Sequence, residues 1–151
     1  MAINADLVLA SPSATFALPE VKRGVVALAG ALPRLVRTVG KQRAMEMALT
    51  GRTLSASEAR EWGLVNRVVG EGEEVVVEAV RWGEVVAGNS PDSVVVSRMG
   101  VGVGWEGMGV EEVSTWLMEV VYPRMDAGEN MREGLRAFVE KRAPRWVDSK
   151  L

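Results

Sequence analysis

The chain contains very few segments that can form β-strands, and this shortage limits its fold more than any other feature. Strand-like patterns occur at residues 6–10, 15–18 and 64–69, whereas helical periodicity dominates the rest of the 151 residues. The edge strands of so small a sheet leave backbone amide and carbonyl groups without partners. We therefore expect an α/β chain whose sheet is incomplete, as if strands were missing from its front.

Helix signals are clear along most of the chain. Ser55 and Glu58 have capping-box spacing, in which the serine accepts a hydrogen bond from the third amide while the glutamate reaches back. Ser90 followed by Pro91 is a second start signal, because proline is tolerated at the first helical position. The pattern predicts helices at residues 31–39, 41–50, 55–63, 71–87, 91–105, 110–125 and 129–142.

The last three of these helices carry breaking signals. Five glycines between residues 100 and 109 each cost a helix roughly 1 kcal/mol relative to alanine, so we expect a break near Trp105. Pro123 and Pro144 should end the following two helices. On the last helix, helical spacing predicts that four apolar side chains face inward: Met131, Leu135, Phe138 and Val139.

Composition and charge narrow the possible functions. Apolar residues make up 48% of the chain and its net charge is −2, so neither nucleic acid nor a membrane is an expected partner. No apolar run approaches the ~20 residues that span a bilayer, and the N-terminus lacks the pattern of a secretory signal. The chain has no cysteine and no histidine. We expect no metal site, and acid–base chemistry near neutral pH must rest on Glu, Asp, Lys or Tyr.

One carboxylate stands out within residues 16–40. A residue before proline is pushed toward extended conformations, so Leu18 should end a strand and Pro19 should fix the turn that presents Glu20. An apolar run at residues 25–29 follows and supplies a candidate pocket wall. This arrangement suits proton chemistry, but the pattern alone favours an ordinary strand-to-helix turn with a solvated glutamate.

Two further patterns have ordinary structural explanations. Residues 102–107 match G-x-G-x-x-G, yet they lie among helical segments and not between a strand and a helix, so we interpret them as a helix break. Phe138 and Lys141 are three residues apart and would share a helix face, where they could stack an adenine and hold a phosphate. Unaided, the pattern favours a packed phenylalanine and a solvated lysine.

The chain ends in Ser149, Lys150 and Leu151, which equals the tripeptide address read by the peroxisomal import receptor. The tripeptide stands at the one position where that receptor reads it. Pro144 should leave these residues outside the last helix and accessible. We therefore expect a peroxisomal location.

Three segments resemble the enoyl-CoA hydratase/isomerase (crotonase) family. They are FALPEVKRG at residues 16–24, the long block from RLVRTVG to LVNRVV at residues 34–69, and EGLRAFVEKRAPRW at residues 133–146. The resemblance runs in register from residue 5 to the C-terminus and is weakest in the glycine-rich stretch. The middle block is the most specific part.

The resemblance implies a fold and its division. Family members are about twice as long and fold as a ββα spiral followed by a helical trimerisation region, so this α/β chain resembles their C-terminal part. Residues 1–70 would belong to the spiral and carry the second catalytic glutamate, residues 71–148 would form the helical region that contacts CoA and other subunits, and residues 149–151 would be the targeting tail. The family's first catalytic glutamate and most of its oxyanion hole would lie before Met1.

The resemblance also assigns residues to the chemistry, which adds water to a trans-2-enoyl-CoA thioester. Glu20 matches the family's second glutamate and would be a general acid/base. Leu18 and Leu28 would contact substrate, with Leu28 adding bulk where many hydratases have glycine. Phe138 and Lys141 match positions that contact CoA, often in a neighbouring subunit. No separate cofactor is implied, because CoA is part of the substrate.

Several alternatives stay open at this point. An isomerase needs one base that moves a proton between carbons, which Glu20 could supply. A chain without the first glutamate could also be catalytically impaired and act only by associating with full-length homologues. The pathway could be fatty-acid β-oxidation or the biosynthesis of a secondary metabolite such as a toxin. The expected partners are an acyl-CoA thioester, further copies in a homo-trimer or hexamer, and the import receptor.

Overall fold

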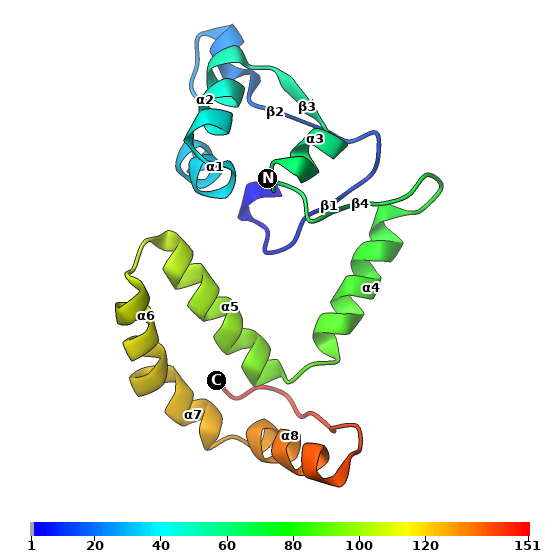
Figure 1. Cartoon of the computed structure of the whole chain (residues 1–151), viewed down its shortest axis with the longest axis vertical. Helices are drawn as coiled ribbons and strands as arrows, with labels where there is room; N and C mark the ends of the chain where they lie inside the picture. The colour runs from blue at the N-terminus through cyan, green and yellow to red at the C-terminus, as the bar shows by residue number, and fades with distance from the viewer. Residues whose placement is uncertain (1) are drawn as a thin grey trace. The chain divides into compact units, whose positions relative to one another are not determined.

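The computed structural model describes residues 2–151, and the chain divides into two compact units, Met1–Arg81 and Trp82–Leu151 (Figure 1). The boundary lies inside the helix α4 (Val75–Ala87), beyond the residue-70 boundary expected for the functional regions.

The first unit combines short helices with four very short strands. β1 (Leu9–Ala10) pairs in parallel with β4 (Arg67–Val68), and β2 (Thr15–Ala17) pairs antiparallel with β3 (Thr53–Ser55). These are two separate two-stranded sheets, so the expected shortage of strands is confirmed for the described residues. The helices of this unit are η1 (Ala2–Asn4), η2 (Pro19–Arg23), α1 (Ala31–Val39), α2 (Lys41–Thr50), α3 (Ala56–Glu61) and the beginning of α4.

Local signals set the ends of these helices. α1 and α2 have the predicted bounds and meet at Gly40, whose φ of 81° favours glycine. The predicted capping box is present before α3: the Glu58 N–H donates to Ser55 Oγ at 3.2 Å, and the Ser55 N–H donates to Glu58 Oε2 at 2.9 Å. α4 begins at Val75, four residues later than predicted, because Gly72 adopts a φ of 78° and forms a turn first.

The core of the first unit is apolar and contiguous. Leu54 of β3 is completely buried and packs with small side chains of α3, namely Ala56 and Ala59, which are also 0% exposed. Burying a leucine side chain stabilises a fold by about 1.5–3 kcal/mol. α1 contributes Leu35 and α2 contributes Met47 to the same cluster, so the two helices that follow Glu20 are fixed against β3 and α3.

The second unit is helical. It contains the end of α4, followed by α5 (Pro91–Glu106), α6 (Val110–Trp116), the π-helical turn η3 (Leu117–Val121), α7 (Tyr122–Asp126) and α8 (Glu129–Glu140), with an extended tail at residues 143–151 (Figure 1). Among the described residues, no helix combines the length and apolarity needed to cross a bilayer.

Two of the breaking signals act differently from each other. α5 runs through its internal glycines and ends at Glu106, next to Gly107 with a φ of 118°, so the break near Trp105 is confirmed. A side chain at Gly100 would meet Leu117 Cδ1 at 3.0 Å, which shows that this glycine allows η3 to approach α5. The prediction that Pro123 ends a helix is wrong. Pro123 lies in the first turn of α7, where the missing N–H is tolerated after the π-helical turn.

The inward face predicted for α8 is wrong at three of its four residues, since only Met131 is half-buried. Leu135, Phe138 and Val139 are 60%, 84% and 78% exposed, while the buried residues of this helix are Asn130 and Ala137. The second unit therefore turns a polar side chain inward and leaves large apolar side chains on its surface. Helical spacing correctly placed these apolar residues on one face of α8, but it did not show that this face is exposed.

Candidate functional site

Glu20 is held by a rigid turn at the end of β2. Pro19 begins η2, as the sequence predicted, but Leu18 lies one residue beyond β2 with φ −120° and ψ 79°, outside the extended range, so the prediction that Leu18 ends the strand is wrong. Gly24 ends η2 with a φ of 69°, and the Val25 N–H donates to the Glu20 carbonyl at 3.2 Å. The backbone of Glu20 is thus fixed on both sides.

The Glu20 side chain lies at an apolar hollow of about 170 Å³. The Oε2 atom of Glu20 is buried and has no hydrogen-bond partner. A buried polar atom normally has a partner, so this unsatisfied oxygen marks Glu20 as the candidate for proton exchange at the hollow. The lining residues come from the η2 turn, from the segment after it and from α1 and α2: Leu18, Glu20, Val21, Val25, Val26, Ala27, Leu32, Ala48 and Leu49.

Of the two leucines expected to contact substrate, one lines the hollow and the other does not. Leu18 lines the hollow together with Glu20, whereas Leu28 is 76% exposed and outside the lining. That Leu28 contacts a substrate stays a prediction. Sequence reasoning missed Ala48 and Leu49 as pocket residues, although both line the hollow and Leu49 is 68% exposed.

The loop between the hollow and α1 is strained. Ala29 has a φ of 55°, a left-handed conformation that costs a residue with a Cβ of order 1–3 kcal/mol. Gly30 follows with a φ of 77°, and a Cβ at that position would lie 2.0 Å from Arg34 Nη1.

Phe138 and Lys141 belong to the second unit. Phe138 is 84% exposed, so the interpretation of a packed phenylalanine is wrong. Lys141 lies beyond the end of α8, with a φ of 54°, and its N–H donates to the Phe138 carbonyl at 3.3 Å. The one-face relation expected from helical spacing therefore does not hold at Lys141. That these residues contact CoA stays a prediction.

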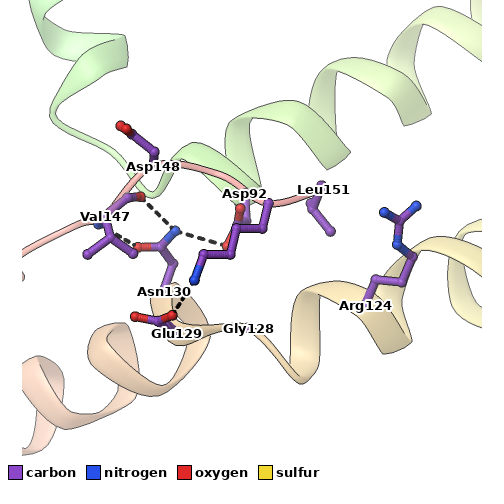
Figure 2. A pocket seen from close by; sticks show the side chains of 9 residues that line it. Asp92, Arg124, Gly128, Glu129, Asn130, Val147, Asp148 and Leu151 are labelled. Atoms are coloured by element: carbon purple, nitrogen blue, oxygen red, sulfur yellow. Dashed lines mark hydrogen bonds and ion pairs between the residues drawn. The ribbon is translucent and has the colours of Figure 1, made fainter.

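A second site, missed by sequence reasoning, lies where the tail runs back along α8 (Figure 2). The Arg145 N–H donates to Glu133 Oε1 at 2.7 Å, and the Trp146 indole N–H donates to the Gly88 carbonyl at 2.9 Å. Further along, Lys150 Nζ pairs with Glu129 Oε1 at 2.5 Å. As the tail proceeds toward its end, its contacts move toward the start of α8, so tail and helix run antiparallel.

The centre of this second site is a buried amide. Asn130 is 2% exposed, and its side chain forms hydrogen bonds with both backbone groups of Val147, accepting from the N–H at 2.9 Å and donating to the carbonyl at 3.0 Å. Its Nδ2 atom also donates to Oδ2 of the buried Asp92 at 3.0 Å (Figure 2). The other oxygen of Asp92, Oδ1, has no partner. The Asn130 side chain, the Val147 backbone and the Asp92 carboxylate thus form one connected hydrogen-bond network.

Charges along α8 reinforce the path of the tail. The pKa of the Glu133 carboxyl is lowered to about 2, chiefly by hydrogen bonds from the Arg142 guanidinium and then by the Arg145 N–H. Glu129 raises the pKa of the Lys150 ammonium through a hydrogen bond and through its charge. The tail lies outside α8, as expected, and most of its residues are exposed, but contacts hold Arg145, Val147 and Lys150 against α8. Within residues 2–151, no cluster of three acidic side chains could hold a metal ion.

The chain is similar to proteins of known family. A model of the enoyl-CoA hydratase/isomerase family matches residues 1–149. The chain is 56% identical over its full length to the mevalonyl-coenzyme A hydratase of Beauveria bassiana, of which it covers 54%. It is 54% identical to the mevalonyl-coenzyme A hydratase of Aspergillus fumigatus, of which it covers 56%.

A solved structure shows the same relation. The enoyl-CoA hydratase subunit I of Geobacillus kaustophilus matches 97% of this chain with a TM-score of 0.90 and 33% identity, and 56% of that protein is covered. The chain thus spans about half the length of the relatives it matches.

Proposed function

Because this chain belongs to the enoyl-CoA hydratase/isomerase family, we propose that it supplies the second catalytic glutamate of an enoyl-CoA hydratase-type protein. Its fold is that of the C-terminal part of a crotonase, as the match to about 56% of a solved hydratase shows. The reaction adds water across the α,β double bond of an enoyl-CoA thioester, or removes it from the 3-hydroxyacyl-CoA.

The observation that carries this proposal is the unsatisfied Oε2 of Glu20 in its aliphatic hollow. In hydration, the hydroxyl of water bonds to C3 of the substrate and a proton bonds to C2, while the double bond is lost. Glu20 would exchange the C2 proton as general acid/base, a role worth typically 10²- to 10⁴-fold in rate. The turn that fixes its backbone would keep the carboxyl at the hollow.

The names of two relatives suggest the acyl group of the substrate. The two relatives above 50% identity are named for mevalonyl-CoA. We therefore favour a short mevalonyl-type acyl group and a dedicated biosynthetic pathway over general fatty-acid β-oxidation.

A chimera tests the catalytic proposal. The C-terminal 54% of the Beauveria bassiana hydratase would be replaced by this chain, which matches it over all 151 residues. Dehydration of mevalonyl-CoA and hydration of crotonyl-CoA would be measured for the chimera, for its Glu20→Gln variant and for Glu61→Gln, an exposed glutamate of the same unit. We expect Glu20→Gln to lower kcat at least 100-fold and Glu61→Gln to leave it within twofold. A Glu20→Gln chimera that keeps half its activity would refute the assignment, and proton exchange between C2 and C4 without hydration would indicate an isomerase.

An assembly role is the second candidate, and the surface of α8 favours it. Leu135, Phe138 and Val139 expose large apolar side chains on one helix, and such patches mark interaction sites in soluble proteins. The second unit would then contact further copies of the chain, in a homo-trimer or hexamer, or full-length homologues. We also propose that the import receptor reads Ser149, Lys150 and Leu151 and directs the protein to peroxisomes.

A further inference from the structure

The tail is held by contacts that a mere chain end does not need. Glu133, Asn130 and Glu129 of α8 hold Arg145, Val147 and Lys150 in turn. Residues three and four apart lie on one helix face, so these acceptors form a row along α8. Trp146 packs against Gly134, where a Cβ would lie 3.2 Å from the indole ring. A side chain at position 134 would therefore push the tail away from the helix.

The strongest of these contacts is the pair of hydrogen bonds between the Asn130 side chain and the Val147 backbone. The amide satisfies the N–H and the carbonyl of one residue, which is the pairing that a neighbouring β-strand would supply. Each such bond contributes net stability, and breaking one inside a buried site leaves a polar group unsatisfied. By contrast, the Lys150–Glu129 pair has side chains 79% and 56% exposed, so solvent screens it strongly.

One residue of the same site, Asp92, disfavours tight binding of the tail. Asp92 is 4% exposed, and its Oδ1 atom has no partner. A buried, partly unsatisfied carboxylate is unfavourable, and water would reach it if the tail left. The hollow of about 160 Å³ beside the tail is lined by Asp92, Arg124 and Leu151, among others (Figure 2). The site thus binds the tail, although Asp92 would be better solvated if the tail left.

We propose that this cleft, formed by Asp92, Arg124, Glu129 and Asn130, is a docking site for the chain's own C-terminus that competes with the import receptor. The inference rests on the proposed peroxisomal address. With Val147 held, residues 148–151 can extend at most about 14 Å from α8. In the docked tail, Glu129 also pairs with the ammonium of Lys150, one of the three residues of the proposed address. Receptor binding therefore requires the tail to leave Asn130.

The test measures the affinity of the peptide-binding domain of a peroxisomal import receptor for the whole chain and for a synthetic peptide of residues 143–151. We expect the peptide to bind about tenfold more tightly, because it has no cleft to leave. Asn130→Ala should bring the whole chain close to the peptide. Val147→Pro, which removes the N–H bonded to Asn130 Oδ1 without changing a buried residue, should do the same even if Asn130→Ala disturbs folding. Val147→Ala keeps both backbone groups and should change the affinity less than twofold.

Equal affinities for peptide and whole chain, or no effect of either variant, would overturn the competition. Hydrogen exchange at the Val147 amide tests docking by a separate route: protection in the wild-type chain that is lost in Asn130→Ala supports docking, and absence of protection refutes it. If the peptide itself does not bind the receptor, the proposed address is wrong and the competition falls with it. The exchange result then shows separately whether the cleft holds the tail.

Discussion

The two units differ in what they bury. The first unit has a contiguous apolar core that includes Leu35, Met47 and the fully buried Leu54. In the described part of the second unit, the buried apolar residues are Val113, Val121 and Ala137, and they share the interior with Asp92 and Asn130. A unit with few buried apolar side chains and many exposed ones gains little from its own core. The first unit thus has the more apolar core, whereas the second leaves large apolar side chains of α8 on its surface.

Two buried oxygens sharpen the contrast. Among residues 2–151, Glu20 Oε2 in the first unit and Asp92 Oδ1 in the second are buried side-chain atoms without a partner. Aliphatic side chains surround Glu20, whereas Asp92 accepts a hydrogen bond from Asn130 and lies beside the tail. The same orphaned carboxylate oxygen therefore suits proton transfer in one unit and a reversible contact in the other.

The largest expected effect concerns activity of the chain by itself. We expect hydration of crotonyl-CoA by residues 1–151 alone to be at least 100-fold slower than by the chimera described above. The chain spans about half the length of the relatives it matches, and loss of even a single oxyanion donor costs about 10²- to 10³-fold in kcat. Steady-state absorbance assays at matched concentrations measure the difference. Robust turnover by the chain alone that disappears in Glu20→Gln would contradict the expectation.

A core substitution tests the difference in packing. Leu54→Ala should lower the free energy of unfolding by about 2–5 kcal/mol, because it removes a fully buried side chain and leaves a cavity. Val139→Ala, at a position 78% exposed, should change it by no more than about 0.5 kcal/mol. Urea titrations followed by circular dichroism measure both values. Similar losses for the two variants would remove the distinction between the units.

Substitution on α8 tests the assembly role of the second unit. Phe138→Asp should weaken self-association about tenfold, because a charge would replace a large exposed apolar group at a contact. Sedimentation equilibrium measures the dissociation constant. Glu140→Gln, at an exposed position on the same helix, serves as the control. If Phe138→Asp associates like the wild-type chain, this part of α8 is not an interface.

The smallest expected effect is a pH dependence at the α3 capping box. Hydrogen bonds, first from the Ser55 N–H and then from Arg52, lower the pKa of Glu58 to about 2. A lowered pKa in the folded state stabilises the fold fully above the ordinary value near 4.5, and this contribution is lost as pH falls from 4.5 toward 2. Urea midpoints of the wild-type chain and Glu58→Gln should therefore differ at pH 7 and converge near pH 2. A constant difference across this range would show that the carboxylate charge is not responsible.

Sequence reasoning succeeded where the deciding groups are close together in the chain. The Ser55–Glu58 box, the glycine between α1 and α2 and the turn that begins at Pro19 all involve neighbours within three residues. Family resemblance added the fold class, because long blocks in register carry information that no single turn contains. Sequence reasoning failed for Pro123, because a π-helical turn that the pattern did not reveal precedes that residue.

The sequence by itself determined the helices, the scarcity of strands, the family and the presence of Glu20 after a rigid proline. The tertiary structure alone decided that Glu20 has an unsatisfied oxygen beside Ala48 and Leu49, and that the tail is held by Asn130. Asn130 meets Asp92 across 38 residues, and the Trp146 indole meets Gly88 across 58. Such pairs have no short-range signal, because burial and partner choice depend on which distant segments the folded backbone brings together.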